Sequence, residues 1–344
     1  MAVYKFIQEK KFPIFFHLVA LMILASFFFV SDLKTPLDNK NRTIVIEVHK
    51  GTSFSKIMDI LSEENLIGNR LAFYAFARLK DAPRNIRAGE YVLSSSMPPS
   101  LIIDKLIRGE VKGYRIPFPE GMTYRQIAST LAEQGLVKEK KFLKLCTDRE
   151  FIASLNIQSA SLEGYLFPDT YILTKSMDEK EIIALMVNRF RKQITPEIIM
   201  SAAERGLDLN QLLTMASLIE KEARIKEEMP KISAVFYNRL KSSMRLQSDP
   251  TAVYGLDNFM GPITRDHLKL NSPYNTYRIS GLPPGPIANP GMDSIRAALE
   301  PAAVDYLYFV SRNDGSHQFS STLALHNHAV REYRLKRQEE IQKD

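Results

Sequence analysis

The sequence predicts an α+β protein in which one N-terminal transmembrane helix precedes small strand-and-helix modules and a larger mixed α/β domain. Three observations support this. One long apolar segment lies near the N-terminus, strand and helix signals alternate after residue 43, and stretches rich in Gly, Pro, Tyr and Asn begin near Phe151. With 45% hydrophobic and 25% charged residues, the chain is globular rather than disordered.

The predicted membrane anchor is residues 12–31, which carry no formal charge and as a helix span roughly 30 Å, the thickness of a bilayer core. Lys5, Lys10 and Lys11 precede it and Asp32 follows. The positive-inside rule therefore predicts a single-pass protein of the cytoplasmic (inner) membrane, with residues 1–11 in the cytoplasm and the rest on the periplasmic or extracytoplasmic side. The run ends in aromatic residues rather than an A-x-A-like site, which disfavours a cleaved signal peptide.

The charge and the cysteine count limit the partners. A net charge of +7 and a pI near 9.2 suit an anionic surface, either a membrane, a nucleic acid or an acidic polymer. Because no dense Lys/Arg block is interleaved with aromatic residues, nucleic acid is not an expected partner. Cys146 is the one cysteine, which excludes an intramolecular disulfide and a CxxC site.

A polar linker, residues 32–42, leads into a module predicted at 43–113. Thr43–Val48 is rich in β-branched residues and is predicted to be a strand, and Ser53 is predicted to cap a helix. A second helix is expected at 69–79, a return strand at 89–93 and a third helix at 100–107.

Part of this module is repeated. Residues 46–67 align without gaps to residues 116–137, with identities that include Gly51/Gly121, Ile57/Ile127 and Leu61/Leu131. A turn glycine and helix-core positions are what a repeated strand–turn–helix unit must keep, so 114–150 is interpreted as a partial repeat and connecting subdomain. The first copy resembles the LysM module, which in its family binds N-acetylglucosamine polymers.

The region 151–330 is interpreted as the catalytic domain, and its central stretch is Gln211–Glu222. Asp208 and Gln211 form a capping-box signal, and Leu212, Ala216 and Ile219 make an apolar stripe. Glu220 lies beside that stripe, where an apolar setting would raise the pKa of its carboxyl and suit a general acid. From the residues alone, the favoured interpretation is a glutamate that only ends the buried part of the helix, because most glutamates at a helix edge are solvated. Glu222 lies about 200° further round the helix and is expected to be an ordinary solvated charge.

Other parts of this domain are expected as follows. Helices are predicted at 179–192 and 231–241, and the proline-rich stretch 281–291 is expected to be a rigid loop. Residues 331–344 are predicted to form a charged, solvated tail.

Six motifs in order give a resemblance to a known family. They are LEGYLFPDTY (162–171), ASLIEKEA (216–223), VFYNRL (235–240), LQSDPTAVYG (246–255), SPYNTYRISGLPPGPIANPGMDSIRAAL (272–299) and YLYFVSRNDGSHQFSSTLALHN (306–327). This set resembles the endolytic murein transglycosylases of the MltG (YceG-like) family. The resemblance implies cleavage of the MurNAc-β-1,4-GlcNAc bond within nascent peptidoglycan strands, 1,6-anhydroMurNAc ends, an end to strand elongation, and peptidoglycan synthases as partners.

In this family the catalytic glutamate is assigned to the first acid of the A-S-hydrophobic-hydrophobic-E-K-E motif, which here is Glu220. An intramolecular nucleophile, the muramic acid 6-hydroxyl, would let one carboxylate act first as acid and then as base. No metal and no cofactor is expected. Candidate substrate contacts are Ser217, Gln247, Asp249, Tyr274, Asn275, Tyr277, Glu163 and Tyr165.

Two alternatives remain open from the sequence. The first is a muramidase, which needs a second carboxylate about 5–5.5 Å or about 6.5–9.5 Å from the acid, with Glu163 or Asp249 as candidates. The second is a non-catalytic scaffold that binds glycan and holds cell-wall synthases.

Overall fold

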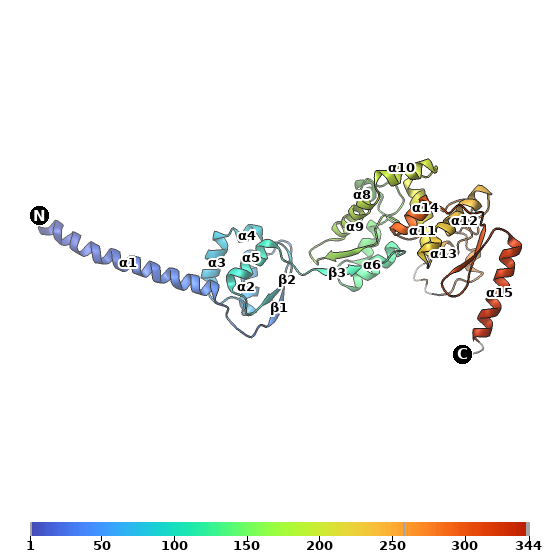
Figure 1. Ribbon diagram of the computed structural model, residues 1–344. Helices are drawn as coiled ribbons and strands as arrows, with labels where there is room; N and C mark the ends of the chain where they lie inside the picture. The colour runs from blue at the N-terminus through green and yellow to red at the C-terminus, as the bar shows by residue number, and fades with distance from the viewer. Residues whose placement is uncertain (1, 257–258, 260, 342–344) are drawn as a thin grey trace. The chain divides into compact units, whose positions relative to one another are not determined.

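A computed structural model describes residues 2–256, 259 and 261–341 (Figure 1). The chain forms two compact units. One comprises Met1–Tyr114 with Ile172–Ser176, and the other comprises Arg115–Tyr171 with Met177–Asp344. Residues 115–150 therefore lie in the same unit as the region that follows them. Residues 342–344 of the predicted tail are outside the described residues. The predicted mixture of helices and strands is confirmed.

The first unit begins with α1 (Ala2–Lys34). Its segment Phe16–Lys34 is long and apolar enough to cross a membrane by length and composition. The helix continues beyond the predicted end at residue 31, and Leu33 is buried. Part of the predicted linker is therefore helical.

An antiparallel strand pair organises the rest of this unit. β1 (Thr43–Val48) pairs with β2 (Gly89–Ser94) along its whole length, from Thr43 opposite Ser94 to Val48 opposite Gly89. Alternate residues of β1 are buried, as a strand with one face on the core requires. The helices of the unit are α2 (Phe54–Glu63), α3 (Arg70–Leu79), α4 (Ala82–Asn85) and α5 (Pro99–Arg108). Residues of α2, α3 and α5 share one core with the strands.

The repeated sequence adopts the same elements at the same offset. In the second unit β3 (Tyr114–Pro117) precedes α6 (Tyr124–Glu133), which occupies the positions aligned with α2. Gly51 and Gly121 both have left-handed backbone, with φ of +85° and +78°, so the shared glycine serves the turn before the helix.

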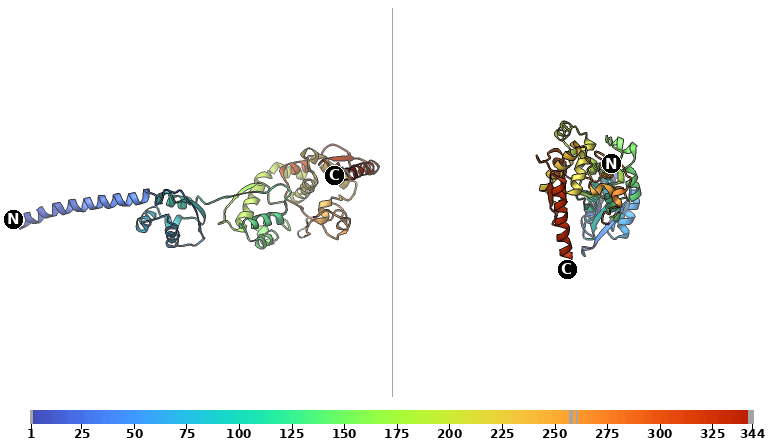
Figure 2. Two further views of the ribbon diagram at one scale, coloured as in Figure 1. Left: turned by 90° about the horizontal axis from the view of Figure 1, so that it is seen from below. Right: turned by 90° about the vertical axis from the view of Figure 1, so that its right-hand side faces the viewer.

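The remaining elements belong to the second unit, apart from the end of β4, which is part of the first unit's segment Ile172–Ser176. They are α7 (Glu139–Leu145), α8 (Arg149–Ser154), β4 (Thr170–Leu173, paired with β3), α9 (Glu179–Gln193), α10 (Pro196–Glu204), α11 (Leu209–Glu222), η1 (Lys226–Glu228), α12 (Met229–Lys241), α13 (Asp249–Val253), η2 (His267–Lys269), α14 (Met292–Leu299), β5 (Tyr308–Ser311), β6 (His317–Ser320) and α15 (Leu323–Ile341). The last helix, red in Figure 2, packs against the β5–β6 hairpin.

The central helix is α11. Its predicted capping box is present, because Asp208 accepts the Gln211 N–H and the Gln211 side chain accepts the Asp208 N–H. All eight residues from Leu212 to Ile219 are buried, since α10, α12, α13 and α14 pack around the helix. The predicted apolar stripe therefore accounts for one side only of the segment Leu212–Ile219, which is buried all round.

Candidate active site

Two carboxylates end the buried part of α11, and they point into different environments. Glu220 is partly exposed, and its Oε2 accepts the N–H of Gly291 at 3.0 Å. Gly291 caps α14 at the end of the proline-rich loop. Glu220 therefore connects α11 to the start of α14.

A further carboxylate, Glu120, lies at the same glycine. A Cβ atom on Gly291 would stand 1.8 Å from Glu120 Oε1, so only glycine leaves room for this side chain as placed. Burial and the negative charge of Glu220 both raise the pKa of Glu120. Glu120 lies outside the six motifs and is not among the predicted site residues. The signal that could have pointed to Glu120 is its position directly before the turn glycine Gly121. A Cβ atom added at Gly121 would contact Glu220.

Glu222 is not the solvated charge that the sequence predicts. Its Oε1 accepts a hydrogen bond from Ser248 Oγ at 2.5 Å. Burial raises the pKa of its carboxyl to about 7, against the opposing effects of Ser248 and the Arg239 charge. The prediction was wrong because it assumed that the face of α11 opposite Glu220 meets water. That face meets other elements of the domain.

A cavity of about 600 Å³ opens beside Glu222, within the size range of ligand pockets. Three of the predicted substrate contacts line it, namely Gln247, Asp249 and Tyr277. The Tyr277 hydroxyl donates to Asp249, and Gln247 has left-handed backbone with φ of +49°. The other lining residues come from several elements: Arg239, Leu246, Phe309, Val310, Ser311, Asn313, His317, His326, Val330 and Tyr333.

Arg239 supplies the positive charge in this wall. The side chain is buried and is fixed by hydrogen bonds from Nε to the Leu307 carbonyl and from Nη1 to the Leu246 carbonyl, both at 2.7 Å. Burial lowers the pKa of its guanidinium, and the charge of Glu222 opposes that shift. The cavity therefore contains a protonatable carboxyl, a fixed cation and several hydrogen-bonding groups.

Glu163 lies in the protein interior, where only 1% of it is exposed. Its carboxyl accepts hydrogen bonds from the Tyr124 N–H, Asn289 Nδ2 and the Tyr254 hydroxyl. Burial raises its pKa to about 8, although the hydrogen bonds from Tyr124 and Tyr254 oppose the shift. The expectation that Glu163 touches substrate conflicts with this enclosure, and the residue instead joins three segments of the domain.

Four other predicted contacts have structural positions. Ser217 Oγ accepts the Ile287 N–H at 3.0 Å and so holds the proline-rich loop on α11. Asn275 is buried and bonds the Leu268 and Leu270 carbonyls. The buried Tyr165 packs on Phe190, and the half-buried Tyr274 on Tyr254. These side chains shape the domain; only Gln247, Asp249 and Tyr277 line the cavity beside Glu222.

Comparison with known proteins gives consistent relatives. The model of the YceG-like family matches residues 46–332. The chain is 36% identical over 332 residues to an endolytic murein transglycosylase of Bacillus subtilis (strain 168), with 91% of each chain covered. It is 30% identical over 338 residues to an endolytic murein transglycosylase of Streptococcus pneumoniae serotype 2, covering 89% of this chain and 61% of that relative.

A solved structure extends the similarity to the fold. The crystal structure of a putative yceG-like protein from Listeria monocytogenes shares 36% sequence identity and a TM-score of 0.58, and the match covers 84% of this chain and all of that one. These matches confirm the resemblance drawn from the six motifs. Because the family model spans well over half of its length, this chain belongs to the YceG-like family.

Proposed function

We propose that this protein is a membrane-anchored lytic transglycosylase that cleaves the MurNAc-β-1,4-GlcNAc bond within nascent glycan strands and leaves 1,6-anhydroMurNAc ends. The names of the curated relatives support the activity. The observation that carries the proposal is the cavity beside Glu222, where a carboxyl with a pKa of about 7 faces polar groups.

The chemistry needs an acid for the leaving oxygen and no external nucleophile. A carboxyl that is still partly protonated near neutral pH can donate to the glycosidic oxygen. The muramic acid 6-hydroxyl then attacks the anomeric carbon of its own sugar, which removes much of the entropic cost of bringing in a nucleophile. The proton of that hydroxyl needs a base in the same cavity.

The geometry favours Glu222 over Glu220 as the acid. The resemblance assigns the role to Glu220, but this carboxylate bonds Gly291 and is not part of the cavity lining. Glu222 shares the cavity with Gln247, Asp249 and Tyr277. In this assignment Glu220 is a positioning residue that fixes the loop before α14.

The test is product analysis with the full chain in detergent and uncrosslinked glycan strands as substrate. Wild type, Glu222→Gln and Glu220→Gln are compared by mass spectrometry of the products. We expect anhydromuramyl ends from wild type, a loss of at least about 10²-fold in rate for Glu222→Gln, as for removal of a general acid, and a smaller loss for Glu220→Gln. The reverse ranking would return the catalytic role to Glu220.

The same experiment separates the alternatives. Reducing muramyl ends would indicate a muramidase, for which Asp249 beside Glu222 and Glu120 beside Glu220 are the candidate second carboxylates. Strands that stay intact but remain bound would indicate a scaffold for synthases.

The first unit is proposed to hold the glycan as a LysM-like module. Its order of strand, two longer helices, the short helix α4 and return strand supports this, as does a cavity of about 250 Å³ lined by the turn after β1, including His49, Lys50 and Thr52, and by Pro83 and Ile86. With α1 in the membrane, the enzyme would meet strands near their synthases.

A further inference from the structure

The β5–β6 hairpin places a histidine in the wall of the cavity beside Glu222. His317 is the first residue of β6, pairs with Ser311 of β5, and lines that cavity. It stands in the motif GSHQF, from which the sequence analysis drew no role. The ring of Phe309 packs edge-to-face against the imidazole of His317, with the ring centroids 5.4 Å apart. The buried Phe236 packs edge-to-face against the same Phe309 ring.

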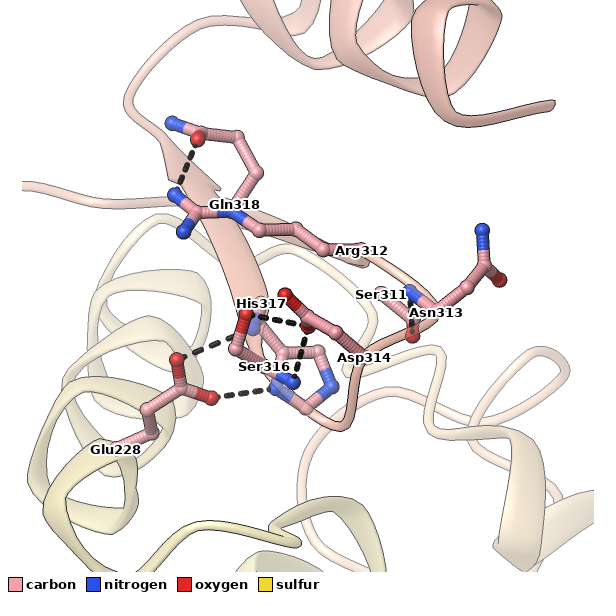
Figure 3. Close-up of polar contacts among 8 residues, drawn as sticks. All are labelled: Glu228, Ser311, Arg312, Asn313, Asp314, Ser316, His317 and Gln318. Atoms are coloured by element: carbon pink, nitrogen blue, oxygen red, sulfur yellow. Dashed lines mark hydrogen bonds and ion pairs between the residues drawn. The ribbon is translucent and has the colours of Figure 1, made fainter. Parts of the chain in front are cut away.

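Glu228, at the end of η1, holds this histidine at two points (Figure 3). Its Oε1 accepts the His317 backbone N–H at 3.1 Å, and its Oε2 contacts Nδ1 at 2.7 Å. The carboxylate is an acceptor, so Nδ1 carries the proton of this bond. In the neutral imidazole Nε2 then has its lone pair available. Nε2 has no hydrogen-bond partner among the residues that the structure describes.

Hydrogen bonds within the turn of the hairpin hold the strand that carries the ring. Asp314 Oδ1 accepts both the N–H and the hydroxyl of Ser316, and the Arg312 N–H bonds the Ser316 carbonyl at 2.9 Å. Asn313 and Gly315 have positive φ, as a tight turn of this kind requires. Figure 3 shows the turn beside the Glu228–His317 pair.

We propose that His317 is a further catalytic residue of the transglycosylase, whose Nε2 accepts the proton of the muramic acid 6-hydroxyl, and that Glu228 is the positioning residue that sets its tautomer. This rests on the proposed function. In the step, Glu222 gives its proton to the glycosidic oxygen and the bond from that oxygen to C1 breaks. The 6-oxygen bonds to C1 while its proton moves to Nε2. Return of that proton to Glu222 through solvent after product release restores both groups, so the substrate is rearranged with no net gain or loss of atoms.

The cavity allows the acid and the base to be different residues. Glu222 on α11 and His317 on β6 reach it from different elements, so acid and base need not occupy one position. A carboxylate–histidine pair of this kind orients the ring and stabilises the imidazolium that forms.

The test measures kcat and KM of the full chain in detergent on uncrosslinked glycan strands, with anhydromuramyl ends as the readout. His317→Ala is expected to lower kcat by roughly 10²-fold, as for loss of a general base, with KM changed less than about threefold. Added imidazole is expected to restore part of the kcat of His317→Ala, which a purely structural role would not allow. His328→Ala, an exposed histidine on α15, is the matched control and should keep wild-type rates.

Two further variants keep the outcome decisive if His317→Ala is unstable. His317→Gln fills the space without providing a base and should lose kcat at an unchanged melting temperature. Glu228→Gln permits the wrong tautomer and should lower kcat more than Glu228→Asp. The role of His317 would be overturned by a wild-type kcat in His317→Gln, or by a folded His317→Ala that imidazole does not rescue. If wild type still forms anhydromuramyl ends, the proposed transglycosylase function would stand in either case. Absence of anhydromuramyl ends from wild type would instead remove the proposed function, and this inference with it.

Discussion

At the scale of single residues, two carboxyls that the sequence presents as ordinary acids are desolvated in the fold, Glu163 in the interior and Glu222 at a partly exposed position. Glu163 and Glu222 have pKa values raised to about 8 and about 7, in each case mainly by burial. A raised carboxyl pKa means that the folded state binds protons more tightly than the unfolded state. Both groups therefore favour the folded state when protonated and weaken it as they ionise.

The first prediction concerns stability against pH. The contribution of Glu163 is fully present below the unfolded carboxyl pKa of about 4.5 and is lost as the pH rises through about 8. We expect the melting temperature of wild type to fall across this window and that of Glu163→Gln to fall less. Glu204→Gln on the exposed end of α10 is the control. Equal slopes in all three proteins would show that Glu163 does not titrate in this range.

The second prediction concerns activity against pH. A general acid must be protonated, so ionisation of Glu222 should lower the rate as the pH rises above about 7. In Glu222→Asp, whose shorter side chain withdraws from Ser248, we expect lower kcat and a displaced basic limb. The measurement is initial rate from pH 5 to 9. An unchanged basic limb in Glu222→Asp would assign that limb to another group.

At the scale of elements, the loop before α14 depends on a close approach at Gly291. The loop is held on α11 through Ser217 and Glu220, and Glu120 occupies the space where a side chain at Gly291 would lie. Gly291 has φ of −81°, which any residue adopts. The requirement for glycine is therefore one of space.

The third prediction follows from this contact. Gly291→Ala should destabilise the fold by about 1 kcal/mol, the lower end for overpacking, because the Glu120 side chain can turn away. The double variant Gly291→Ala with Glu120→Ala should recover part of that loss. Gly261→Ala, where a Cβ meets no atom within 4 Å, is the control. Thermal melts compare these proteins with wild type and with Glu120→Ala alone, and additive losses in the double variant would contradict the proposed overlap.

At the scale of the whole molecule, the chain combines one apolar helix with two compact units. The fourth prediction is that the full chain sediments with membranes and that a variant starting at Thr35 does not. In spheroplasts, added protease should cleave the domains outside the membrane. Protection from protease without detergent would place them in the cytoplasm and contradict the predicted orientation.

Much of the secondary structure was predictable because its signals are local. Ser53 and Asp208 each cap the helix that follows them, as their sequence positions indicate. The aligned repeat likewise located α6 from α2. The motifs identified the family and three of the residues that line the cavity.

What the sequence by itself determined is therefore the local elements, the long apolar N-terminal helix and the family. Tertiary structure decided which acid of α11 faces the cavity, because that depends on Ser248 and on the β5–β6 hairpin, which are distant in sequence. It also decided that Glu163 is interior and that Glu120 stands beside Glu220. Burial and charge coupling arise only when separate segments pack together, so helix periodicity could not distinguish a solvated glutamate from a protonated one.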